Sequence, residues 1–194
     1  MSDDPKQTRA KVPRKITETS LRNSALYYLQ RYASSCENLK RVLMRRVMRA
    51  AQVHETDIDE ASGWIDNLIE RLTASGLLDD RIYAEGRMRA LFRRGVSPRG
   101  IAQRLQQKGI DGEIIEQMIS KLHELSSNPN LLAAVKYAKR RRLGPFRPQP
   151  ARDARFEKDL AALARAGFDY QTALRVISAA SIAELEEIAE DVVL

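Results

Sequence analysis

The chain has few of the residues that most catalytic and metal sites need. One cysteine, Cys36, and two histidines, His54 and His123, occur in 194 residues. A lone thiol excludes an internal disulfide, which fits a reducing compartment. Neither histidine has a cysteine or acidic partner at metal-ligand spacing, and there is no glycine-rich phosphate loop or His-Glu-x-x-His motif. The sequence therefore predicts no metal, no cofactor and no enzyme.

Long apolar runs and aromatic residues are also scarce. No run approaches the ~20 apolar residues of a membrane span, and the basic segment 2–20 lacks the apolar stretch of a signal peptide. We expect a monomeric, cytoplasmic protein. Aromatic residues make up 6% of the chain, and few lie among the basic residues. Base stacking is therefore not expected to dominate any binding of nucleic acid.

Positive charge is what the chain has in excess. Charged residues make up 30% of it, and the formal net charge is +7. An excess of this size indicates a polyanionic partner or an acidic protein surface. A merely soluble basic protein is the alternative. Hydrophobic residues make up 43%, which is enough to build a core.

Helix start and stop signals alternate through the middle of the chain. Ser97 followed by Pro98 is a strong start signal, because proline lacks only an N–H that would have no partner in the first turn. Glycine readily adopts the left-handed conformation that ends many helices. Together these residues predict consecutive short helices. The start signals are Asp79, Asp80, Ser97 and Asp111, and the stop signals are Gly76, Gly95 and Gly109.

The same pattern recurs on both sides. Residues 35–43 match 97–105 without a gap, and 167–177 match 109–119. This spacing of roughly fifty residues indicates tandem repeats, and repeats of this size must share a core with their neighbours. The predicted fold is all-α: an elongated, curved array of three tandem three-helix repeats with a short C-terminal acidic helix. A compact monomer with its helices folded back is the structural alternative.

Composition sets the predicted boundaries. Proline and glycine interrupt the third repeat at residues 144–150, a stiff loop that is not expected to be helical. The predicted segments are a flexible basic arm at 1–18, an atypical first repeat at 19–78, a second repeat at 79–127, a third repeat at 128–178 and an acidic extension at 179–194.

The helix that begins near Ile82 carries the first group of candidate binding residues. A helical wheel places Arg89 and Arg93 on its polar side, and Arg87 and Arg94 beside its apolar arc. An arginine beside an apolar arc can lay its stem on the core and present its guanidinium group at the edge of a groove. The alternative is a solvated face with pairs within the helix, such as Glu85 with Arg89.

A second group lies at residues 136–147, where six cations follow one another with no acid between them. Adjacent cations at a helix end repel, and the helix dipole relieves only part of that cost. A phosphate backbone or an acidic protein surface would relieve more. This group comprises Lys136, Lys139, Arg140, Arg141, Arg142 and Arg147, and a weaker stripe contains Arg99, Arg104 and Lys108.

From these groups the sequence predicts one set of partner-binding residues. Residues 97–122 could also form a helix-turn-helix, but its second helix is acidic and apolar, which argues against insertion into a DNA groove. The candidate residues are Arg87, Arg89, Arg93, Arg94, Arg99, Lys108, Lys139, Arg140, Arg141 and Arg142.

Four motifs in combination resemble the RecX family of bacterial recombinase regulators. They are Gly-Leu-Leu-Asp-Asp-x-x-Tyr-Ala at 76–84, Arg-Arg-Gly at 93–95, Ser-Pro-Arg-Gly-Ile at 97–101 and Lys-Gly-Ile-Asp at 108–111. Arg-Ala-Gly-Phe at 165–168 resembles that family's third repeat, and the similarity covers roughly residues 20–178. The resemblance implies tandem three-helix repeats and a regulatory role without catalytic residues.

Members of that family bind the RecA recombinase and lie in the groove of its filament on DNA. The resemblance therefore implies a protein that inhibits the recombinase, ATPase and coprotease activities of RecA, and so modulates DNA repair and the SOS response. Its basic faces could also contact DNA phosphates. The alternative is a general DNA-binding protein that uses its basic helix faces without a recombinase partner. That alternative predicts steeply salt-dependent binding to naked DNA.

Overall fold

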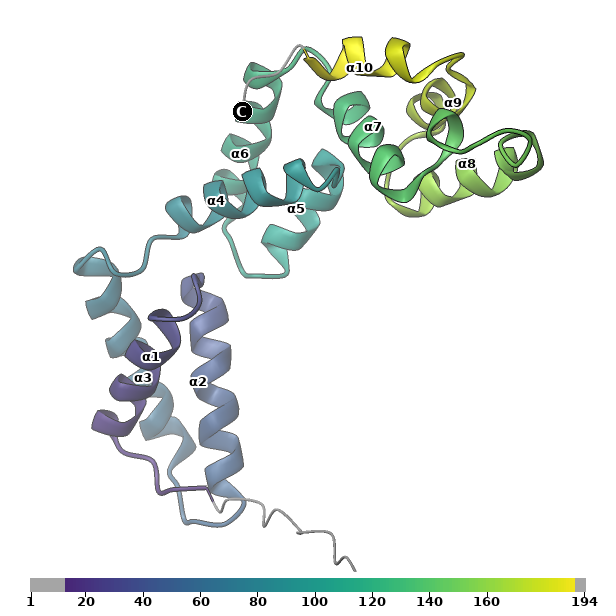
Figure 1. Ribbon diagram of the computed structural model, residues 1–194. Coiled ribbons are helices and arrows are strands. Elements are labelled where there is room, and N and C mark those ends of the chain that lie inside the picture. The colour runs from purple at the N-terminus through teal and green to yellow at the C-terminus, as the bar shows by residue number, and fades with distance from the viewer. Residues whose placement is uncertain (1–12, 191–194) are drawn as a thin grey trace, which may run out of the picture. The chain divides into compact units, whose positions relative to one another are not determined.

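The computed structural model describes residues 13–190, and these form α-helices and two short 3-10 turns with no strand (Figure 1). The predicted all-α class is confirmed. The chain divides into two compact units, unit 1 at Met1–Asp79 and unit 2 at Asp80–Leu194. Most of the predicted basic arm, residues 1–12, and the last four residues of the acidic extension lie outside the described residues.

Within residues 13–79, unit 1 contains three helices, each begun by a side chain that accepts a hydrogen bond from a backbone N–H of the first turn. The capping residues are Thr17, Ser35 and Asp57. Such caps satisfy donors that have no partner within the helix. The helices are α1 at Glu18–Leu29, α2 at Cys36–Ala51 and α3 at Ile58–Ala74.

The core of unit 1 is one cluster of buried residues that extends from Ile16 to Leu78. Ile16 is 5% exposed and stands directly before the capping Thr17, as in a hydrophobic staple. His54 Nε2 lies 2.7 Å from the carbonyl oxygen of Pro13. Pro13 and Ile16 thus pack against the helices of unit 1. Both residues were predicted to belong to the flexible arm, which was expected to end at residue 18.

Unit 2 contains the remaining seven helices of the described residues. Three glycines were predicted to end helices, and each has a positive φ angle just after a helix. They are Gly76 after α3, Gly95 after α4 and Gly109 after α5, so these three stop signals are confirmed. The short helix predicted in the acidic extension is present as α10. The helices are α4 at Asp80–Arg93, α5 at Pro98–Gln106, α6 at Gly112–Leu125, α7 at Pro129–Arg141, α8 at Phe156–Arg165, α9 at Tyr170–Ser178 and α10 at Ile182–Glu190.

One hydrophobic cluster joins all the helices of unit 2. It includes Phe92 of α4, Met118 of α6, Leu132 of α7, Leu163 of α8 and Leu185 of α10, each at most 1% exposed. Neighbouring repeats were expected to share a core, and the helices assigned to the second and third repeats do so. The buried residues of unit 1 form a separate cluster.

The proline-rich loop was not expected to be helical, but it contains one 3-10 turn at Gly144–Phe146. Such a turn needs only i to i+3 bonds, such as Arg147 N–H to the Gly144 carbonyl at 3.0 Å. Asp159, 3% exposed, fixes the loop. Its carboxylate accepts from the Gly144 N–H at 3.0 Å and from two nitrogens of Arg147 at 2.8 and 3.1 Å.

Candidate functional site

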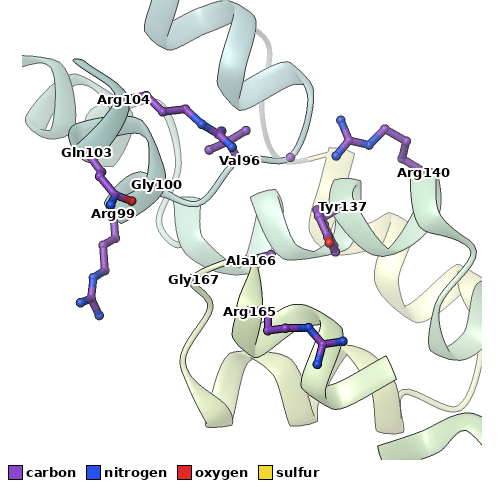
Figure 2. A pocket seen from close by; sticks show the side chains of 11 residues that line it. Val96, Arg99, Gly100, Gln103, Arg104, Tyr137, Arg140, Arg165, Ala166 and Gly167 are labelled. Carbon is purple, nitrogen blue, oxygen red and sulfur yellow. The ribbon is translucent and has the colours of Figure 1, made fainter. Parts of the chain in front are cut away.

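A hollow of about 290 Å³ lies in unit 2 among residues of α5, α7 and the turn after α8. Arginines from α5, α7 and α8 surround it (Figure 2). They are Arg99 and Arg104 from α5, Arg140 from α7 and Arg165 from α8, and no carboxylate is among the lining residues. Four guanidinium groups with no carboxylate in the same lining favour an anionic ligand.

Gly95 allows the wall of this hollow to form. It lies in the turn between α4 and α5 with a φ of +71°, a conformation that strains other residues. A Cβ atom at this position would lie 2.4 Å from the backbone nitrogen of Tyr137 and 2.8 Å from the carbonyl oxygen of Ala133. Glycine therefore lets the turn approach the α7 backbone and brings α5 beside the end of α7.

Ser97 connects the same turn to the segment predicted to form the third repeat. It is fully buried and caps α5 by accepting from the Gly100 N–H at 3.1 Å. Its hydroxyl also donates to the carbonyl of Ala166 at 3.4 Å. Gly167 presents its bare Cα on the same side, and a Cβ there would lie 3.1 Å from the Ser97 hydroxyl oxygen. This contact holds Arg99 near the segment that carries Arg165.

Aromatic contacts shape the α7 side of the hollow. The Tyr137 ring packs against Phe168 with ring centroids 5.9 Å apart. The Arg140 guanidinium lies 5.6 Å from the centre of the Tyr137 ring, within range of a cation–π contact. Lys136 lies over the ring of Phe92 at 4.8 Å, and burial lowers the pKa of its ammonium group. Lys136 thus packs on the core of unit 2 and does not line the hollow.

Of the ten candidate residues predicted from sequence, the hollow brings together Arg99 and Arg140. Arg93 and Arg94 are exposed at the end of α4, just before Gly95. Lys108 is half-buried beyond the end of α5. The binding role of these residues stays a prediction.

On α4 the arrangement of Arg89 is the one expected of a solvated face. Arg89 forms an ion pair with Glu85 at 2.8 Å, and Lys121 of α6 pairs with the same carboxylate at 2.7 Å. The hydrogen bond from Lys121, with that from Arg89, lowers the pKa of Glu85. Arg87 is half-buried, and its buried Nε has no hydrogen-bond partner in the part of the chain that the structure describes.

The second predicted group is divided by the fold. Lys139 forms an ion pair with Glu186 of α10 at 2.8 Å, which places an acidic side chain against the basic end of α7. Arg147 was expected to contact an anion, but it binds Asp159, which raises the pKa of its guanidinium. Arg141 lines a second hollow of about 560 Å³ with residues of α8. Arg142 ends α7 in the left-handed conformation, with a φ of 55°.

Two arginines of the first hollow, Arg104 and Arg165, were not selected from the sequence. Arg104 was noted only in the weaker stripe. Arg165 stands two residues before Gly167, the glycine that aligns with Gly109 in the repeat match. That alignment was a usable signal, because it placed a cation at the end of a helix just before a turn.

The predictions also omitted the basic helix of unit 1, α2. Lys40 pairs with Asp66 at 2.5 Å and Arg41 pairs with Glu37 at 3.1 Å. The remaining three cations of α2 form no ion pair within residues 13–190; they are Arg45, Arg46 and Arg49.

Two further observations concern other classes of site. Among the described residues, no group of three or more His, Cys, Asp or Glu side chains could hold a metal ion. No helix within residues 13–190 has the length and apolar character required to cross a membrane.

Comparisons with known proteins agree on one family. A family model described as the second three-helix domain of RecX matches residues 79–119. Over 177 residues the chain is 42% identical to a regulatory protein RecX from Myxococcus xanthus, with 90% of this chain and 93% of the relative covered. It is 33% identical over 172 residues to a regulatory protein RecX from Agrobacterium fabrum, with 88% of each covered.

A solved structure supports the same fold. The crystal structure of RecX from Lactobacillus salivarius matches with a TM-score of 0.54 and 23% identity, covering 88% of this chain and 97% of that one. At this identity the likeness shows the fold alone.

Proposed function

Because the chain belongs to the RecX family of regulatory proteins, we propose that it binds the filament that the RecA recombinase forms on DNA and restrains the filament's activities. These activities are strand exchange, ATP hydrolysis and the coprotease function that starts the SOS response. The protein would act in the cytoplasm as a modulator of DNA repair.

The observation that carries the proposal is the cationic hollow of unit 2. Its four arginines come from α5, α7 and α8, and no carboxylate neutralises them within the lining. A nucleoprotein filament offers both phosphates and carboxylates, and a guanidinium group can bind either with two parallel hydrogen bonds. Because Gly95 and Ser97 fix the helices that carry these arginines, the backbone around the hollow needs little ordering on binding.

The same chemistry favours regulation over catalysis. Arginine does not lose its proton in proteins, so the charged groups of the hollow cannot serve as general bases. Its remaining lining residues are Gly95, Val96, Gly100, Gln103, Tyr137, Ala166 and Gly167. None is a serine, cysteine or lysine nucleophile paired with a base. We propose that the arginines around the hollow bind a surface of the filament and so block it.

The test reverses two charges of the hollow. The double variant R99E/R140E should inhibit the DNA-dependent ATPase of RecA at least about tenfold less well, because charged interface pairs contribute on the order of a few kcal/mol. The matched control is R22E/R175E, which changes the same charge at two exposed arginines outside the hollow. If both double variants inhibit like the unaltered protein, the hollow is not the contact.

Binding measurements separate this proposal from general DNA binding. The unaltered protein should bind RecA–DNA filaments more tightly than bare DNA or free RecA at both 50 mM and 200 mM salt. A general DNA-binding protein would bind bare DNA as tightly as filaments, with a steep salt dependence set by the number of phosphates neutralised. Equal affinity for bare DNA and filaments would favour that alternative.

A further inference from the structure

Unit 1 exposes a group of aromatic rings at the C-terminal end of α1. Three of the chain's six tyrosines occur within residues 27–32. Tyr27 is 56% exposed and Tyr32 is 57% exposed, although each ring carries a large apolar surface. Leu26 beside them is 36% exposed. An exposed cluster of large apolar side chains on a soluble protein indicates a binding surface.

These rings are held in place before any partner arrives. The Arg31 guanidinium lies 4.2 Å from the centre of the Tyr27 ring. The Tyr32 ring packs on Tyr28 with centroids 5.1 Å apart, and the Tyr28 hydroxyl accepts from the Asn38 amide nitrogen at 3.3 Å. Ordered aromatic side chains lose little conformational entropy on binding, which favours affinity.

The charge around these rings favours a protein partner over a nucleic acid. A single strand of nucleic acid is held by a positively charged groove that follows its backbone, with bases stacked on aromatic rings. Within residues 13–190, Arg31 is the one cation that lies on these rings, whereas four arginines surround the hollow of unit 2. Tyrosine and arginine together are typical of the residues that dominate binding energy in protein interfaces.

We propose that Tyr27, Arg31 and Tyr32 form a second contact surface, here named the tyrosine surface, which binds the protein component of the filament. The inference rests on the proposed function, because it takes the RecA filament as the partner. It adds a contact of different chemistry: the tyrosine surface offers aromatic area to a protein, while the hollow of unit 2 offers charge to an anion.

The test removes both exposed rings in the full chain. Y27S/Y32S should bind a RecA filament assembled on oligothymidylate at least about tenfold more weakly than the unaltered protein, as expected for two central interface aromatics. Tyr170 is a matched control, because it is 61% exposed on unit 2, and Tyr170→Ser should stay within about twofold of the unaltered protein. The salt dependence of filament binding and the affinity for bare oligothymidylate should not change with Y27S/Y32S.

Each other outcome overturns the inference. If the unaltered protein binds the filament and Y27S/Y32S binds equally well, the tyrosine surface is not a contact, while the proposed function stands. If Y27S/Y32S weakens binding to bare oligothymidylate equally, the rings stack on bases and the partner is the nucleic acid. If the unaltered protein does not bind the filament, the proposed function fails as well. Should Y27S/Y32S unfold, Arg31→Glu tests the same surface, with the same weakening expected.

Discussion

Two equivalent helix starts show how the units differ. Ser35 begins α2 in unit 1 and Ser97 begins α5 in unit 2, and both serines are fully buried. Three residues later, unit 1 has Asn38 and unit 2 has Gly100. The Asn38 amide donates to the Ser34 hydroxyl at 2.8 Å and to the Tyr28 hydroxyl, so it stays within its own unit. Gly100 has no side chain and lines the hollow.

The difference indicates how one repeated element acquires two uses. In unit 2 the serine also donates a hydrogen bond to Ala166 after α8, and Gly95 lies against α7 without a Cβ. The position that matches Gly95 in unit 1 is Ala33, which is exposed. Near this helix start, unit 2 thus has a contact between α5 and the turn after α8 with arginines around it, whereas unit 1 has a hydrogen bond that fixes the Tyr28 ring.

The largest effect is expected where glycine allows close backbone contact. Gly95→Ala should destabilise unit 2 by more than about 4 kcal/mol, because its Cβ would lie 2.4 Å from a backbone nitrogen at a φ of +71°. Gly76→Ala at the end of α3 has a φ of +73° but no atom within 4 Å. It should cost unit 1 only about 1 kcal/mol, the usual penalty of the left-handed conformation.

Urea denaturation measures both changes, because the chain's one tryptophan, Trp64, lies in α3 of unit 1. Trp64 fluorescence should follow unit 1, while circular dichroism follows both units. Gly95→Ala should leave the urea midpoint seen by fluorescence unchanged. It should lower the midpoint of the transition of unit 2, which is seen by circular dichroism alone. A fluorescence midpoint that falls with Gly95→Ala would show that the two units unfold together.

Ion pairs give the next contrast. Asp159→Asn should cost unit 2 about 3 kcal/mol, because it leaves the Arg147 guanidinium without its buried carboxylate partner. Asp66→Asn removes the carboxylate that pairs with Lys40 in unit 1, where both side chains are more than a third exposed. That change should cost less than about 1 kcal/mol. If both variants lose the same free energy of unfolding in urea, burial does not strengthen the contribution of Asp159 to stability.

The sequence was sufficient for most of the fold because helix ends are local. Ser97, Asp111 and the stop glycines mark helix ends through backbone chemistry that acts within one turn. The arrangement of the arginines is not local. Arg99 and Arg165 share a hollow through tertiary contacts such as that between Ser97 and Ala166, 69 residues away in the sequence.

Arg147 shows the same limit from the other side. Its position after five cations predicted an anionic ligand, and its partner is the carboxylate of Asp159, 12 residues further on. A local charge pattern therefore predicts which cationic residues bind an anion. Whether that anion is a carboxylate of the chain itself depends on tertiary contacts.

Helix caps provide a smaller, pH-dependent contrast. Asp169 caps α9, accepting from the Thr172 N–H and hydroxyl at 2.8 and 2.7 Å and from the Asn130 amide. These bonds, with that from the Thr172 backbone the largest, lower the pKa of Asp169 below its usual value of 3.8. A lowered folded-state pKa means that this stabilisation is present above the unfolded-state pKa and is lost as pH falls through the folded value.

Asp169→Ala should therefore cost about 1 kcal/mol at pH 7, and the loss should shrink as the pH falls below about 4. Thr17 caps α1 of unit 1 with an uncharged hydroxyl. Thr17→Ala should cost a similar amount at both pH values. Urea denaturation at pH 7 and pH 3 checks this, and an Asp169→Ala loss that is equal at both would exclude a charge-dependent cap.

The smallest effect is expected at exposed ion pairs, where the two units should behave alike. Lys139 and Glu186 are 63% and 46% exposed, and Arg71 and Glu18 of unit 1 are 60% and 52% exposed. In double-mutant cycles with glutamine at each position, both pairs should show coupling below about 0.5 kcal/mol, because water and salt screen them. The buried Leu185 would then be what holds α10 on α7. A coupling above about 1 kcal/mol at Lys139–Glu186 alone would show that charge fastens α10, which would make its position on α7 sensitive to salt.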